Sequence, residues 1–335
     1  MFKYLSAAVC LFLLCECVPA HGQETAPDRF VYFHPSIYRI SPQGRISRFE
    51  LPENDEMLLS IMGSTRPQVS PDQRWIAFTK ENDLWLYNTR TQKMRRATHA
   101  GRPYTEKLAS VLVLVVNWSA DSTRVLLNVV AGDTECVDCD DRDDWKPRKS
   151  AYGYFAYNVS TGRLSRIALS EGFSVWDWRA DGRMVGSREF SEDPSPVMVV
   201  PGAKPQAVHG LEGRSVLGLS ISRDGSWAVA ATSEYKNSHI VRVDLKTGEA
   251  VALTPEGAWG EYGAALISPA DKHISWIHRT GAVNAGAKEV LIDGKTVFTC
   301  ASELLVYDWL DEQRIAVNCD GTVQVVDERT KQASK

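Results

Sequence analysis

Residues Val69 to Thr98, VSPDQRWIAFTKENDLWLYNTRTQKMRRAT, decide the fold that we expect for this chain. Ser70-Pro71-Asp72-Gln73 is typical of a tight turn, because Pro fixes φ and Asp can accept a hydrogen bond from the backbone two residues on. Two apolar runs follow, Trp75–Phe78 and Asp83–Tyr87, and a polar run, Arg95–Thr98, ends the unit. The stretch predicts three short strands, which could not bury both of their faces alone.

The same turn recurs along the chain at intervals of roughly 42 to 60 residues, and an apolar run follows each copy. Repeats of this period, with four short strands each, are typical of a β-propeller. An all-β sandwich with chance similarity between its turns is the alternative. The later copies of the turn begin at Ser119, Arg179, Ser222, Ser268 and Leu310.

The order of these features resembles a known repeat family. A Ser-Pro-Asp-Gly turn, an apolar strand, a Leu-Tyr-x-x-Asp-x-x-x-Gly segment and a basic-Leu-Thr ending are similar to the WD40-like (PD40) repeat. That repeat builds the propeller of TolB and the N-terminal propellers of prolyl-oligopeptidase-type peptidases. Val69–Thr98 and Ser222–Thr254 match it best, whereas Ser268–Asp293 carries Ala270 where the family has Asp. The resemblance implies an architecture and no single function.

We expect an all-β propeller of seven blades, each a four-stranded antiparallel sheet. The six phased turns give six units, and strands within the segment from Phe30 to Met62 make a seventh. Six blades with a closing N-terminal extension is the runner-up. We also expect the two termini to meet in one blade, because ring closure removes exposed sheet edges.

The first residues predict export from the cytoplasm. Lys3 supplies a positive charge, Leu5 to Cys15 form an apolar stretch, and small residues near Ala20 fit a cleavage site. A membrane anchor is the weaker alternative, because Glu16 interrupts the stretch and a span needs about 20 apolar residues. We expect a signal peptide at residues 1–22, then one propeller domain at 23–335 with a loop insertion at about 132–150. The mature chain is expected to be periplasmic or secreted and not membrane-spanning.

The cysteine count agrees with an oxidising compartment. Of seven cysteines, the expected mature chain keeps four: Cys136, Cys139, Cys300 and Cys319. Cys136–Cys139 and Cys300–Cys319 are the favoured disulfides, although four cysteines allow three pairings. A redox pair or half of a zinc site fits Cys136 and Cys139 less well, because they lie in a Gly- and Asp-rich loop with no second pair at zinc-ligand spacing.

The insertion has the most unusual composition in the chain. Residues 132–145 hold seven carboxylates and one arginine. Dense oxygen ligands suit Ca²⁺, but the spacing is not that of an EF-hand, and a solvated acidic loop is the alternative. The calcium candidates are Asp133, Asp138, Asp140, Asp141 and Asp143. The aromatic residues expected to contact a partner there are Trp145, Tyr152 and Tyr154.

Other tryptophans are expected to pack between blades. Trp118, Trp178 and Trp309 occupy similar places just before their turns, which favours sheet-on-sheet burial. Stacking of aromatic residues on glycans is the alternative.

Two kinds of catalytic site can be weighed from the sequence. Peptidase activity is not expected, because the sequence holds no Gly-x-Ser-x-Gly motif. A metal site in the channel, with His34 and His239 as candidates, stays open, since the sequence does not bring these residues together.

The formal net charge of −4 argues against a general nucleic-acid binder. We therefore expect a non-catalytic binding scaffold in the cell envelope, without a cofactor other than Ca²⁺. Its partner would be an envelope protein or peptide, or else a glycan, and the insertion would be its distinctive contact. The alternative is a metal-dependent enzyme, a lyase or lactonase-type hydrolase that acts on a sugar or small molecule.

Overall fold

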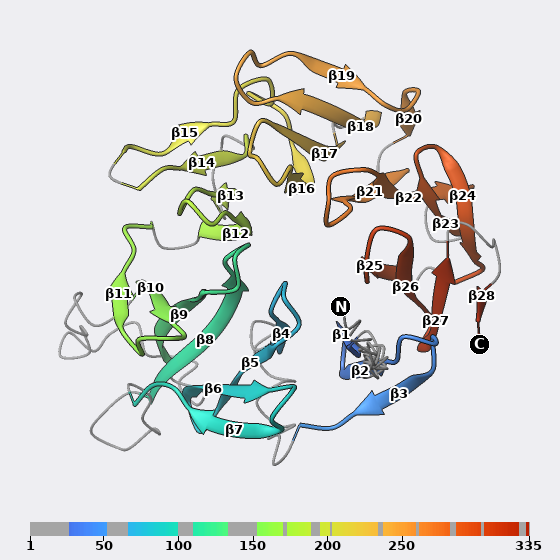
Figure 1. The fold of residues 1–335 in the computed structure, drawn as a ribbon. Helices are drawn as coiled ribbons and strands as arrows, with labels where there is room; N and C mark the ends of the chain where they lie inside the picture. The colour runs from blue at the N-terminus through green and yellow to red at the C-terminus, as the bar shows by residue number, and fades with distance from the viewer. Residues whose placement is uncertain are drawn as a thin grey trace, which may run out of the picture.

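The computed structural model confirms the predicted all-β propeller of seven blades (Figure 1). It describes residues 27–51, 66–99, 110–132, 153–169, 173–188, 195–201, 203–233, 237–258, 261–281, 286–302, 305–327 and 333–334. No helix in these ranges is long and apolar enough to cross a membrane. Part of the segment from Phe30 to Met62, in which the strands of a seventh unit are predicted, falls outside them.

Seven antiparallel sheets follow one another in chain order around the ring. Blades 1 to 3 consist of β1 (Arg29–Phe33), β2 (Ser36–Ile40) and β3 (Ile46–Phe49); β4 (Gln68–Val69), β5 (Trp75–Lys80), β6 (Asp83–Asn88) and β7 (Lys93–Arg96); and β8 (Ser110–Trp118), β9 (Arg124–Gly132), β10 (Gly153–Asn158) and β11 (Leu164–Arg166).

Blades 4 and 5 complete the far side of the ring, and β20 pairs with β18 beside the main path of blade 5. They consist of β12 (Phe173–Trp178), β13 (Met184–Arg188), β14 (Val197–Val199) and β15 (Gln206–Ala207); and β16 (Val216–Ile221), β17 (Trp227–Ser233), β18 (Asn237–Asp244), β19 (Ala250–Ala252) and β20 (Gly257–Ala258).

Blades 6 and 7 bring the chain back to blade 1. They consist of β21 (Tyr262–Ile267), β22 (Ile274–Thr280), β23 (Ala287–Ile292) and β24 (Lys295–Cys300); and β25 (Leu305–Trp309), β26 (Arg314–Cys319), β27 (Thr322–Asp327) and β28 (Ala333–Ser334).

The repeated turn folds because Ser and Asp side chains replace missing backbone partners. In blade 2, the Ser70 hydroxyl donates to Asp72 Oδ1 at 2.7 Å and accepts the Trp75 N–H at 2.9 Å. Asp72 Oδ1 also accepts the Arg74 N–H at 3.1 Å. The turn at Ser222 repeats this arrangement, with Asp224 as acceptor. The sequence pattern Ser-x-Asp is therefore turn chemistry, as predicted.

The core lies between neighbouring blades. Leu84 and Leu86 of blade 2 pack against Val113 and Leu127 of blade 3, and all four are fully buried or nearly so. Burial of each such side chain contributes about 1.5–3 kcal/mol. The predicted packing role of the tryptophans before the turns is confirmed. Three of them are buried in these interfaces: Trp118, Trp178 and Trp309.

The expectation that the termini share a blade is wrong for the described residues. β1 to β3 form one sheet and β25 to β28 form the next, with no strand in common. Side chains close the ring instead: Val31 and Phe33 of blade 1 pack with Leu310 and Val325 of blade 7. The Arg314 guanidinium also donates to the carbonyl of Pro42, across the same junction, at 3.0 Å.

A disulfide joins Cys300 at the end of β24 to Cys319 at the end of β26. It links blade 6 to blade 7, beside the closing junction, and it is one of the two pairings that the sequence favours. Cys136 and Cys139 lie outside the described residues.

Candidate functional site

Most of the site residues predicted from sequence lie outside the described residues. These are Trp145, Tyr152, Asp133, Asp138, Asp140, Asp141 and Asp143. Tyr154 is described, and its predicted role as an exposed partner contact is wrong. Its side chain is only 6% exposed, and its hydroxyl donates to the carbonyl of Phe173 in blade 4 at 2.6 Å. Tyr154 is a packing residue because β10 turns it toward the neighbouring blade.

The insertion is attached to the far end of blade 3 from the repeated turn. In the β8–β9 pair, Trp118 lies opposite Val125 next to the turn, and Ser110 lies opposite Gly132 at the other end. Gly132 at the end of β9 and Gly153 at the start of β10, between which the insertion falls in the sequence, therefore lie at the end of the sheet far from the turn. The turns mark a different functional surface.

That surface is a central cavity of about 1030 Å³. The turns and the ends of the inner strands line it, so every blade contributes. In blades 2 to 7, the last residue but one of the inner strand faces the cavity. The residues at this position are Gln68, Asn117, Asp177, Ser220, Leu266 and Asp308.

The cavity is acidic overall. Its lining contains seven carboxylates and four guanidinium groups. The guanidinium groups belong to Arg29, Arg66, Arg179 and Arg223. The carboxylates belong to Asp72, Asp121, Asp177, Asp271, Asp308, Asp311 and Glu312.

Asp308 places a carboxylate in the water of this cavity. Its side chain is exposed, and its Oδ1 accepts the N–H of Trp309 at 2.8 Å, which fixes its orientation. The protein that surrounds the cavity disfavours the charged form and raises the pKa of Asp308 to about 6. The Trp309 N–H opposes this effect. Asp308 can therefore change its charge in a mildly acidic medium.

Asp177 is held more tightly than Asp308. Its Oδ2 accepts the Ile221 N–H of blade 5 at 3.1 Å and lies 3.7 Å from Arg179 Nη1. Burial raises the pKa of Asp177, and Arg179 and the two backbone donors from Ile221 and Trp178 oppose that shift. Arg179 in turn donates to the carbonyls of Ile221 and Arg223. This pair therefore positions the neighbouring inner strand and also lines the cavity.

Hydrogen bonds connect the turns around the cavity mouth from blade to blade. The Asp72 N–H donates to the Ser122 hydroxyl at 2.9 Å, and the Arg223 N–H donates to Asp271 Oδ2 at 2.7 Å. Glu312 accepts hydrogen bonds from the Ser268 hydroxyl and the Ala270 N–H of blade 6. Glu312 thus supplies, from the next blade, the carboxylate that the turn of blade 6 lacks at Ala270. The mouth is a hydrogen-bonded ring.

The described histidines do not line the cavity. Those with a side-chain partner bond elsewhere. The pairs are His34 with Tyr32, His209 with Glu212, His273 with Asp293, and His278 with Glu261 and Glu289. His239 lies on β18, and its Nδ1 is buried without a hydrogen-bond partner. Within the described ranges, no three His, Cys, Asp or Glu side chains are placed to hold a metal ion together.

Blade 1 differs from the other blades, because it has three strands in the described part of the chain. In blade 2, the second strand begins at Trp75, opposite Asn88, beside the hairpin turn that follows β6. In blade 1, β1 begins at Arg29, opposite Ile40, beside the hairpin turn that follows β2. β1 therefore corresponds to the second strand of the other blades. The cavity side of β1 is where those blades have their inner strand.

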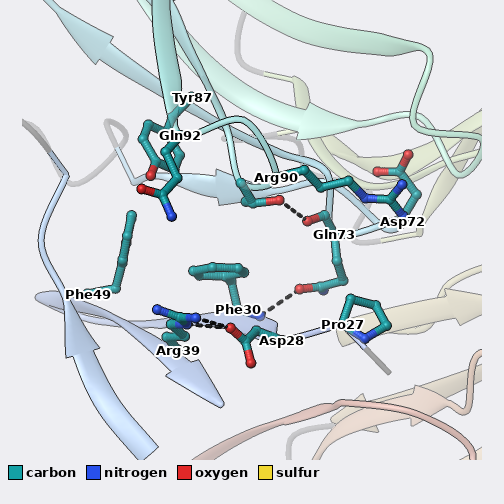
Figure 2. Close-up of a pocket in the computed structure, with 11 residues that line it drawn as sticks. Pro27, Asp28, Phe30, Arg39, Phe49, Asp72, Gln73, Tyr87, Arg90 and Gln92 are labelled. Atoms are coloured by element: carbon teal, nitrogen blue, oxygen red, sulfur yellow. Dashed lines mark hydrogen bonds and ion pairs between the residues drawn. The ribbon is translucent and has the colours of Figure 1, made fainter. Parts of the chain in front are cut away.

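Gln73 occupies part of this edge. Its Oε1 accepts the Phe30 N–H of β1 at 2.6 Å, and the carbonyl of Gln73 accepts the Thr89 hydroxyl at 2.7 Å (Figure 2). Gln73 has φ of 63°, in the left-handed region, where the repeat usually has Gly. A non-glycine residue there costs about 1–2 kcal/mol. The bond to blade 1 explains why a side chain is useful at this position.

A second, smaller pocket of about 310 Å³ lies between blades 1 and 2. Phe30, Phe49 and Tyr87 form its apolar wall, and the ion pair of Arg39 with Asp28 lies beside them (Figure 2). Gln73 lines both this pocket and the central cavity. It therefore lies between the two spaces.

The sequence did not predict that Asp177 and Asp308 face the cavity. Asp177 and Asp308 each precede a tryptophan that packs between blades. An alignment of the repeats by their turns would have found them, because alternate residues of an inner strand point to opposite sides.

No protein-family model matches the chain, and neither does any curated protein. Among solved structures it resembles a prolyl endopeptidase, with 15% identity, a TM-score of 0.54 and coverage of 89% of this chain and 45% of that chain. It also resembles an oligogalacturonate lyase from Vibrio parahaemolyticus, with 13% identity, a TM-score of 0.52 and coverage of 87% and 83%. A putative TolB from Agrobacterium tumefaciens has 15% identity, a TM-score of 0.45 and coverage of 70% and 80%. At these identities the likeness shows a shared propeller fold and nothing further.

Proposed function

We propose that this chain is an exported, non-catalytic propeller that binds an extended, cationic segment of a partner protein in its central cavity. The observation that carries the proposal is the acidic lining of a cavity of about 1030 Å³, with Asp308 exposed inside it. Lys and Arg side chains pair with carboxylates through charge-assisted hydrogen bonds, which are stronger than neutral ones.

The size of the cavity favours a polymer segment over a small molecule. Ligand pockets for small molecules usually measure about 300–1,000 Å³ and are mostly apolar. This cavity lies at the upper end of that range, and its lining contains many charged and polar side chains beside apolar ones. A rigid ring with a polar channel suits a chain that threads or lies within it.

Export is the second part of the proposal. The disulfide between Cys300 and Cys319 is typical of an oxidising compartment, and the N-terminal sequence resembles a secretory signal. We place the mature protein in the periplasm or outside the cell. The insertion at residues 132–150, with its calcium candidates, is a proposed second contact on the opposite face of the ring.

Panning a displayed library of random ten-residue peptides against the mature chain tests the proposal. We expect selected peptides rich in Lys and Arg. Asp308→Asn should weaken their binding about tenfold, because a hydrogen bond to a charged group is worth about 1.5–3 kcal/mol. Glu249→Gln is the matched control: Glu249 is exposed on blade 5, outside the cavity, and its loss should leave affinity unchanged.

Two results would contradict the proposal. If peptide affinity were unchanged by Asp308→Asn but lost on deletion of residues 133–149, the binding site would be the insertion and not the cavity. A stoichiometric transition metal in protein purified without chelator would favour the alternative, a metal-dependent propeller enzyme.

A further inference from the structure

We infer that the cavity-side edge of β1 binds the partner segment by strand addition, so that the partner supplies an inner strand for blade 1. This inference rests on the proposed function, because it specifies how the cationic segment is held in the cavity. It starts from the three-stranded sheet of blade 1, whose first strand lies nearest the centre of the ring (Figure 1).

The backbone of β1 presents to the cavity an edge that no described strand pairs with and that Gln73 occupies only in part. The Phe30 N–H points away from β2, because it donates to Gln73 of blade 2. In an antiparallel pair, backbone groups alternate between the two sides of a strand, so Tyr32 also directs its N–H and carbonyl away from β2. Among the described strands, none pairs with this side of β1. Arg29 to Tyr32 line the central cavity.

The direction of the added strand follows from the other blades. Every inner strand in blades 2 to 7 is antiparallel to the second strand of its own sheet. A partner segment would therefore run antiparallel to β1. Backbone bonds would give affinity, and alternate side chains would give specificity.

If the signal peptide is cleaved as proposed above, few residues of this chain precede β1. Cleavage after Gly22 would leave Gln23 to Ala26 before Pro27 and Asp28, which line the pocket between blades 1 and 2. The inner strands of blades 3 to 7 contain five to nine residues, and that of blade 2 contains two. Glu24 would also add a negative charge to an acidic cavity. On charge, a basic partner segment fits this acidic cavity better than residues 23–26 do.

Charge and polarity define the chemistry of that segment. Asp308 is exposed in the same cavity, and Val306, two residues before it on β25, is 51% exposed on the same side of the strand. A segment with Lys or Arg opposite Asp308 and a small apolar residue opposite Val306 matches both groups. The class of ligand is an extended basic peptide.

N-methylation of a selected ten-residue peptide tests the inference. A strand on an edge presents only alternate amides to its neighbour. We therefore expect that methylating one alternate set of amides weakens binding by more than about tenfold, and that methylating the other set changes it by less than about threefold. Equal effects of the two patterns, with the unmodified peptide still bound, would overturn strand addition and leave the proposed function standing.

Changes in the protein give an independent measurement. Tyr32→Pro removes the cavity-facing N–H, whereas Tyr32→Ala removes only the side chain, so the Pro variant alone should lose most of the binding. Hydrogen exchange of residues 29–33 in the unaltered protein tests the inference even if the Pro variant misfolds. The bound peptide should slow exchange at the Tyr32 N–H. Unchanged exchange in the peptide-bound protein would overturn the inference.

A variant that begins at Pro27 distinguishes a partner segment from residues 23–26 as the occupant of the β1 edge. The inference predicts the same exchange at residues 29–33 and the same peptide affinity as in the longer mature chain. Faster exchange together with tighter peptide binding would show that residues 23–26 already occupy the edge, and it would overturn the assignment to a partner.

Discussion

Asp308 is the residue whose charge state should respond most directly to pH. Its pKa of about 6 in the folded protein lies above the usual aspartate value of 3.8, so the folded protein disfavours the charged form. The contribution of the neutral form to stability is fully present below pH 3.8 and is lost as the pH rises through about 6. Cavity water screens this effect, so the change should be small.

The first prediction concerns Asp308→Asn. The amide keeps an acceptor for the Trp309 N–H and cannot ionise. We expect a higher melting temperature than that of the unaltered protein at pH 8, and no difference at pH 4. Thermal unfolding at the two pH values measures this. A difference of the same size at both would show that charge is not the cause.

Gln73 carries the second prediction. Gln73→Ala keeps the left-handed φ and loses the bond to Phe30, so it should destabilise the protein by about 1 kcal/mol. Gln73→Gly loses the same bond but relieves the backbone, so it should be more stable than the Ala variant by about 1 kcal/mol. Denaturant unfolding of the pair compares them directly, and equal stabilities would refute the strain.

At the scale of one element, the turn of blade 6 shows how a missing residue is replaced. The Ser hydroxyl of the other turns donates to an Asp two residues on, as Ser70 does to Asp72, but Ser268 donates to Glu312 of blade 7. A departure from the repeat thus becomes a contact between blades.

We predict that Glu312→Ala lowers the free energy of unfolding by about 1–2 kcal/mol, since it removes the acceptor of two hydrogen bonds. Ala270→Asp should recover part of this loss in the Glu312→Ala background, because it restores an acceptor within the turn. In the native background it should give no gain, since two carboxylates would lie close together. Stability of the four proteins in a double-mutant cycle provides the test.

Local patterns predicted the elements well and their long-range pairing less well. Strands such as β5 and β6 follow from turn residues and apolar runs that lie within a few positions of each other. The absence of a described inner strand beside β1 depends on pairing across the sheet. Nothing in the sequence from Phe30 to Phe33 distinguishes a first strand from a second. The same limit applies to Tyr154, whose burial depends on the neighbouring blade.

On the scale of the whole molecule, the disulfide stabilises the side of the ring where the chain ends. Cys300 and Cys319 are 19 residues apart, so the bond restricts a loop of moderate length in the unfolded chain. A loop of this size gives about 3 kcal/mol.

We therefore expect Cys300→Ala combined with Cys319→Ala to lower the free energy of unfolding by about 2–4 kcal/mol. Unfolding in the presence of a thiol reductant should bring the unaltered protein to the stability of the double variant. If the reduced protein kept its full stability, the bond would not contribute to the fold.

The junction of blades 1 and 7 can open more easily than it could if the two blades shared a strand. In the described part of the chain, side chains and one guanidinium hold this junction and no strand spans it, so it can separate without breaking a described β-sheet. A strand added to β1 would lie at that end of the ring, close to β25. Thermodynamic linkage then requires reciprocity: if a bound segment favours the closed junction, closure strengthens binding by the same factor. The partner would then help to hold the ring closed, and its binding could be detected as an increase in the stability of the ring.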